Sequence, residues 1–183
     1  KRGRSDAWEI AGSVTNLGLI FFAILAAVVI IFAQPLYALF APGFSGAERV
    51  QIVSLARILL VAQGFFVVSY VLTAVLESSR RFLVPALAPL FYNLGIIFGT
   101  ILFAERLHLI GPTIGVLFGA SSHFLIQLPL AVRLGFRFKP RIKITESVKK
   151  IGKLALPRVI EVSFLEVSKT VELFLASLIS TAS

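Results

Sequence analysis

The chain has 183 residues, of which 57% are hydrophobic and 15% are charged, and it contains no cysteine. A soluble domain of this size cannot bury so much apolar surface, so the composition excludes water as the main solvent. Without cysteine, disulfide bonds and thiol chemistry are also excluded. The net charge of +9 does not indicate nucleic acid, because the basic residues cluster at the ends of apolar stretches, where anionic lipid headgroups attract them.

Long apolar stretches dominate the chain, and each contains the roughly 20 residues that are needed to cross a bilayer. They cover residues 12–40, 52–76, 83–104, 110–132 and 154–180. We therefore predict an all-α fold, a polytopic membrane helix bundle in which residues 1–183 form a single membrane domain with a transmembrane helix in each stretch.

The connecting segments alternate in their content of Lys and Arg. The segments before residue 12, around residue 80 and over 133–153 are rich in these residues, whereas the other two connections carry only Arg49 and Arg106. Because cytoplasmic loops hold the excess of Lys and Arg, the pattern predicts a cytoplasmic N-terminus and a consistent orientation through all five crossings.

The chain also has the features of an internal piece of a longer multi-span protein. It begins at Lys1, ends at Ser183 directly after an apolar run, and contains no methionine. The apolar run that starts at Ile10 is too long for a signal peptide. We expect further helices of the same protein outside this segment.

Small residues recur at every fourth position in the third and fourth spans. The glycines of this pattern are Gly95, Gly99, Gly111, Gly115 and Gly119. A stripe of residues without side chains lets two helix backbones approach closely, so these two spans are expected to form a tightly packed pair.

Polar residues inside the second and fourth spans have two interpretations. The polar residues of the second span are interpreted as mostly forming hydrogen bonds between helices, and contact with a substrate is the alternative. They are Gln63, Ser69, Tyr70, Thr73 and Glu77. For His123 a role in proton relay is the alternative, but no carboxylate lies within one turn of it on the same helix, which favours a satisfied interhelical hydrogen bond.

The cytoplasmic loop 133–153 mixes basic and apolar residues. We expect a short amphipathic helix there, opened by Thr145 and lying on the membrane surface. Its charges are interpreted as a topology and lipid anchor in preference to a specific site. The apolar residues interspersed with the basic residues of this loop are Ile142, Ile144, Val148 and Ile151.

The fifth span differs from the others because it contains five charged residues. They are Arg158, Glu161, Glu166, Lys169 and Glu172. Each charge near the bilayer centre costs ~2.5 to 3.5 kcal/mol, whereas each large apolar residue returns only ~0.3 to 0.6 kcal/mol. The charges share one helical face, with Lys169 placed to pair with Glu166 or Glu172.

Two interpretations of this face remain open. It lines a water-filled substrate cavity, for which the candidate residues are Arg158, Glu161, Lys169 and Glu172, or it forms an ion-pair ladder that only holds helices together.

Several short motifs, in order along nearly the whole chain, together resemble one family. Arg81-Phe82, Pro85-Ala86-Leu87-Ala88-Pro89 and Asn93 are similar to the segment entering the fifth helix of the MviN/MurJ-type lipid II flippases. The other matching motifs are Ala41-Pro42-Gly43-Phe44, Gln127-Leu128-Pro129, Lys153-Leu154-Ala155-Leu156-Pro157-Arg158 and Leu175-Ala176-Ser177.

The resemblance implies that the chain holds helices three to seven of a transporter of the multidrug/oligosaccharidyl-lipid/polysaccharide exporter superfamily. Such a protein is not an enzyme but a multi-pass protein of the bacterial cytoplasmic (inner) membrane. It moves the undecaprenyl-linked peptidoglycan precursor, lipid II, across that membrane by alternating access and so serves cell wall biogenesis and cell shape. Its partners are the lipid bilayer, the precursor and the remaining helices of the full-length transporter.

The resemblance carries over one functional position. Some members use a carboxylate just before the Leu-Ala-Ser motif in a sodium site, and Glu172 holds that place here. A sodium ion is therefore the single cofactor that the family implies. Glu161 and Lys169 depart from the family pattern, which has a small residue at the first position and an apolar residue at the second. The family's essential arginines belong to its first, second and eighth helices and have no counterpart in this segment.

Three other functions compete with this one. A sibling exporter of polysaccharide lipids or drugs would share the fold but not the Pro-Ala-Leu-Ala-Pro segment. A membrane-embedded enzyme acting on polyprenyl phosphates needs clustered acidic or His residues near the inner surface, where the chain offers only Glu77 and Glu146. A structural scaffold would have no need for the charges of the fifth span.

Overall fold

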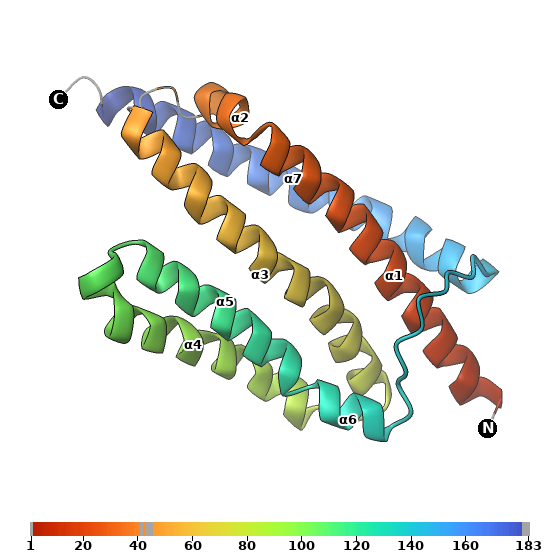
Figure 1. The fold of residues 1–183 in the computed structure, drawn as a ribbon. Helices are drawn as coiled ribbons and strands as arrows, with labels where there is room; N and C mark the ends of the chain where they lie inside the picture. Colours follow the sequence, from red (N-terminus) through yellow and green to blue (C-terminus); the bar gives the residue numbers. More distant parts are fainter. Residues whose placement is uncertain (1, 41, 43–45, 181–183) are drawn as a thin grey trace. The chain divides into compact units, whose positions relative to one another are not determined.

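The computed structural model describes residues 2–40, 42 and 46–180, and these residues form helices and their connections (Figure 1). Lys1 and most of the Ala41-Pro42-Gly43-Phe44 motif lie outside the described residues. The all-α prediction is confirmed. The helices are α1 (Arg2–Ile31), α2 (Ala33–Phe40), α3 (Gly46–Ser78), α4 (Leu83–Leu107), α5 (Ile110–Leu125), α6 (Leu128–Arg133) and α7 (Glu146–Ser180).

The chain divides into two compact units. Unit 1 comprises Lys1–Ile24 and Leu55–Lys143, so it contains the first part of α1, most of α3 and all of α4, α5 and α6. Unit 2 comprises Leu25–Ser54 and Ile144–Ser183 and contains α2 and α7.

Four segments of the described chain are long and apolar enough to cross a bilayer, which makes this a multi-pass membrane protein. They are Asp6–Ile31, Gly46–Ser78, Leu83–Leu107 and Ile110–Arg133. The last of these joins α5 and α6 into one crossing. The predicted fifth span is helical throughout its described residues as part of α7, but its charges keep it outside this set, and its crossing of the membrane stays a prediction.

One end of unit 1 is closed by an apolar cluster that joins three helices and a connecting segment. Leu72 and Leu76 of α3 pack with Ala131 of α6 and with Phe136, and Trp8 of α1 lies against them. The start of α1, the end of α3 and the end of α6 therefore lie together. A chain that crosses the membrane back and forth must place these three helix ends on the same side.

The predicted span over residues 12–40 is divided in the structure. The α1 helix ends at Ile31 and α2 begins at Ala33. Pro35 has no backbone N–H to donate to the carbonyl of Ile31, so the regular helical ladder is interrupted at this point. The sequence contains this signal at Pro35, but the length of the apolar run favours the prediction of a single helix.

The predicted amphipathic helix within 133–153 is wrong as a separate element. Residues 136–145 are not helical, and α7 runs without interruption from Glu146. The sequence from Phe136 to Ile144 alternates apolar and basic residues apart from Pro140, which is a period of two and not of 3.6. The predicted start is confirmed, because Thr145 Oγ1 accepts a hydrogen bond of 3.3 Å from the Val148 N–H at the first turn of α7.

Candidate functional site

The glycine stripe lies where α4 and α5 pack against each other in unit 1, side by side in Figure 1. A methyl group at Gly115 would lie 2.8 Å from the carbonyl oxygen of Gly95 and 2.9 Å from Cα of Gly99. Methyl groups at Gly111 and Gly119 would meet the backbone of α4 at Phe103 and Tyr92. The two backbones are thus in direct contact, which side chains at these positions would prevent.

A chain of buried hydrogen bonds joins α3 to the end of α5. Thr73 Oγ1 donates to Gln127 Oε1 at 2.8 Å, and Gln127 Nε2 donates to Ser69 Oγ at 2.8 Å and to the His123 carbonyl at 3.0 Å. Ser69 Oγ lies 2.6 Å from His123 Nδ1. The predicted interhelical hydrogen bond of His123 is confirmed.

All residues of this polar chain belong to unit 1. Ser69 and Gln127 are fully buried, with 0% of their surface exposed. Both amide hydrogens of Gln127 are engaged, and a Ser69 hydroxyl that donates to Nδ1 fits the neutral imidazole with its proton on Nε2. Polar groups that are satisfied by a neighbouring helix in this way stabilise the packing of that helix.

The charges of α7 behave differently, because in the described part of the chain the ion pairs that they form lie within their own helix. Arg158 Nη1 lies 2.7 Å from Glu161 Oε1, and Lys169 Nζ lies 2.7 Å from Glu166 Oε1. Both pairs join residues three positions apart and leave their side chains at least 60% exposed. Of the two partners predicted for Lys169, the structure selects Glu166.

Glu172 is the carboxylate left over from this pairing. Two cations and three carboxylates give this stretch of α7 a net charge of −1, and within the described part of the chain no cation pairs with Glu172. The apolar residues beside it, such as Val171 and Leu173, are exposed as well. Contacts inside unit 2 therefore leave the charged face of α7 uncovered.

A cavity of about 300 Å³ lies elsewhere, in unit 1 beside the first turns of α1. The predicted cavity candidates on α7 do not line it. Sequence reasoning missed this site, although the alternation of basic and apolar residues between Phe136 and Ile144 was its signal. The lining residues are Trp8, Glu9, Gly12, Ser13, Gly135, Arg137, Lys139, Arg141 and Lys143.

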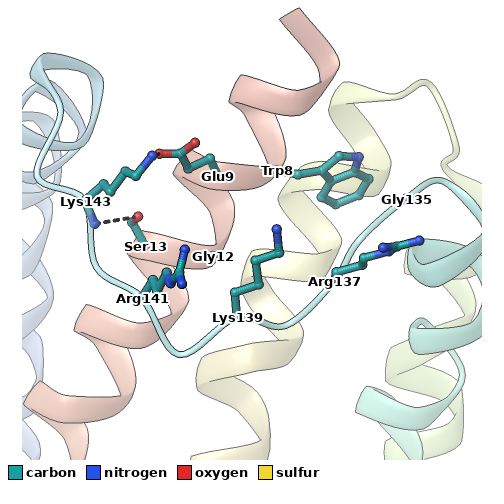
Figure 2. A pocket seen from close by; sticks show the side chains of 9 residues that line it. All are labelled: Trp8, Glu9, Gly12, Ser13, Gly135, Arg137, Lys139, Arg141 and Lys143. Carbon is teal, nitrogen blue, oxygen red and sulfur yellow. Dashed lines mark hydrogen bonds and ion pairs between the residues drawn. The ribbon is translucent and has the colours of Figure 1, made fainter. Parts of the chain in front are cut away.

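Side chains of α1 hold the connecting segment in place along this cavity. Trp8 Nε1 donates to the Leu134 carbonyl at 3.2 Å, and the Trp8 ring meets Phe136 edge-on with centroids 5.5 Å apart. Asn16 Nδ2 donates to the carbonyls of Lys139 and Arg141 at 2.7 and 2.9 Å. Figure 2 shows the cation side chains that this segment carries.

Comparisons with known proteins point to one family. A family model described as lipid II flippase MurJ matches residues 1–183. A protein of Borreliella burgdorferi named probable lipid II flippase MurJ is 29% identical over 136 residues, which cover 74% of this chain and 27% of that protein. A protein of Vibrio cholerae with the same name is 29% identical over 113 residues, or 60% of this chain and 22% of that protein. The aligned part thus spans about a quarter of each of these two curated relatives.

Proposed function

The chain belongs to the lipid II flippase MurJ family, and we propose that the protein containing it moves lipid-linked peptidoglycan precursor across the bacterial cytoplasmic membrane by alternating access. Its reaction is then the relocation of a lipid and not the making or breaking of a bond. The other helices of the full-length transporter would complete the path, because this chain corresponds to about a quarter of the related proteins.

The charged face of α7 is the observation that carries the proposal within this chain. Arg158, Glu161, Lys169 and Glu172 share one side of a helix whose neighbours in unit 2 leave them exposed. Charges in a spanning helix are stable only beside water, counter-charges or ligand. A path for a polar, phosphate-bearing headgroup supplies that environment, which supports a role of this face in lining the path.

Within the face, Glu172 is the residue suited to couple an ion to the transport cycle. Its carboxylate is not consumed by an ion pair in the described part of the chain, whereas Glu161 and Glu166 each hold a cation. A carboxylate oxygen is a hard ligand of the kind that alkali and alkaline-earth cations prefer. Glu172 would supply one such ligand to a sodium ion.

The proposal is tested with the full-length protein carrying Glu172→Gln. We expect the variant to accumulate in the membrane like the wild type but to support little growth of cells depleted of their own flippase. In proteoliposomes it should flip fluorescent lipid II slowly and with a rate that no longer responds to sodium. The amide keeps the size of the side chain and removes the charge that attracts the cation.

The matched control is Glu146→Gln, the same change in the first turn of α7, where the carboxylate forms an exposed ion pair with Lys149. It should leave flipping and its sodium response unchanged. If Glu172→Gln lowers membrane abundance in proportion to activity, the face is an ion-pair ladder and not a transport surface. If the wild-type protein flips no lipid II but moves another lipid or a drug, the proposed substrate is wrong.

A further inference from the structure

The cavity beside α1 gathers cations from alternate positions of one segment. Arg137, Lys139, Arg141 and Lys143 all line it, whereas the intervening Phe138, Pro140 and Ile142 do not. Figure 2 shows Lys139 and Arg141 extending from the connecting segment into the space beside α1. A period of two places the charges on one side of the segment.

The positive charge of this cavity is only partly neutralised. Glu9 is the one carboxylate among its lining residues, and it pairs with Lys143 at 2.6 Å. Within the described part of the chain, no carboxylate pairs with Arg137, Lys139 or Arg141. The cavity therefore keeps three uncompensated cations.

Hydrogen bonds to side chains of α1 order the backbone that carries these cations. Asn16 is 7% exposed and uses its amide group to bind the carbonyls on both sides of Pro140. Ser13 Oγ accepts a hydrogen bond of 3.1 Å from the Lys143 N–H. The cations are thus presented by an ordered segment, which lowers the entropy cost of gathering them around an anion.

The position of the cavity matches the level of lipid headgroups. It lies at the start of the first candidate span and beyond the end of the fourth, which are Asp6 and Arg133. Trp8 in its wall is the residue type that marks the bilayer–water boundary. The charge pattern of the loops puts this end in the cytoplasm, where the leaflet surface is anionic.

We propose that this cavity binds the phosphate group of an anionic lipid headgroup on the cytoplasmic side of the membrane. Arginine offers paired N–H donors that match phosphate oxygens, and lysine adds a compact charge beside them. None of its lining residues belongs to α7. The inference goes beyond the proposed flippase function and does not rest on it, since it concerns a resident membrane lipid.

The test measures binding of fluorescent phosphatidylglycerol to the purified full-length protein in neutral detergent. The double variant Lys139→Gln/Arg141→Gln should bind at least about tenfold more weakly, because each cation near a lipid surface contributes roughly fivefold to affinity. The matched control Lys150→Gln/Lys153→Gln removes the same charge from exposed positions outside the cavity and should stay within about twofold of the wild type.

A third variant separates an ordered site from general charge attraction. Asn16→Ala keeps every cation but releases the two carbonyls, and it should weaken binding about fivefold. Size-exclusion profiles identify any variant that fails to fold. Equal losses in the two double variants, or no loss in Asn16→Ala, would overturn the proposal.

Soluble inorganic pyrophosphate identifies the source of the phosphate. If the labelled lipid binds and pyrophosphate displaces it, the result supports recognition of a lipid phosphate. Binding of pyrophosphate without binding of the lipid, lost again in Lys139→Gln/Arg141→Gln, assigns the same phosphate chemistry to a soluble compound and overturns the lipid as its source. Binding of neither overturns the site.

Discussion

Two helices of this protein, α5 and α7, both carry polar residues through stretches that are otherwise apolar, yet they use them in opposite ways. In α5 the His123 side chain is buried and lies within hydrogen-bond distance of Ser69 of α3, and the glycines are covered by α4. In α7 the charged residues pair only along their own helix and stay exposed. Polar groups that the chain itself satisfies hold the fold, whereas those it leaves uncovered are available to other helices, ions or substrate.

The largest expected effect comes from breaking the close contact on the α5 side. Gly115→Leu should lower the free energy of unfolding by about 3 kcal/mol or more, because even its first carbon would collide with the backbone of α4. Gly115→Ala should already destabilise measurably. Membrane abundance of the full-length protein and its thermal unfolding in detergent measure both changes.

Two control substitutions test whether the loss of stability comes from the close contact between α4 and α5. Gly152→Leu is the same substitution in α7, where a side chain would meet nothing within 4 Å, and Ile97→Leu changes a half-exposed residue of α4. Both should be tolerated. If Gly152→Leu is as harmful as Gly115→Leu, close helix contact is not what distinguishes α5 from α7.

A smaller loss is expected when the buried polar chain is interrupted. Gln127→Leu should cost about 1 to 3 kcal/mol, because Ser69 and Thr73 lose a buried partner that an apolar side chain cannot replace. Chemical unfolding in detergent measures this difference. The companion change Thr100→Val removes a hydroxyl that is exposed and bonded only within its own helix, and it should cost much less.

The contrast between α5 and α7 could largely be anticipated from sequence, for a local reason. Gly111, Gly115 and Gly119 recur every four residues, so their shared face follows from helix geometry alone. The charges of α7 are recognisable because each is costly in an apolar helix. The pairing of Lys169 with Glu166 in preference to Glu172 was not decided by spacing, since both lie three residues away.

The basic cavity could not be anticipated in the same way, because its walls come from distant parts of the chain. Asn16 binds the carbonyl of Lys139, which is 123 residues away, and no local pattern connects them. The alternating sequence between Phe136 and Ile144 did carry a signal of extended backbone. The prediction of a surface helix opened by Thr145 follows from the mixed charge of the loop and not from this alternation, since membrane-surface segments with mixed charge are commonly amphipathic helices.

The smallest effect on stability is expected on α7, where the comparison can be sharpened most. Exchanging the charges of one pair, Arg158→Glu with Glu161→Arg, keeps an ion pair at the same spacing and should change the free energy of unfolding by less than about 1 kcal/mol. Under the proposed function, flipping of lipid II by the full-length protein should nevertheless fall severalfold, because the exchange moves each charge by three residues along the face proposed to line the substrate path. The same exchange at Glu146 and Lys149, an exposed pair in the first turn, should leave both stability and flipping nearly unchanged. If the exchange at Arg158 and Glu161 leaves flipping at the wild-type rate, only the presence of a pair matters there, and α7 would resemble α5 in using its polar residues for the fold.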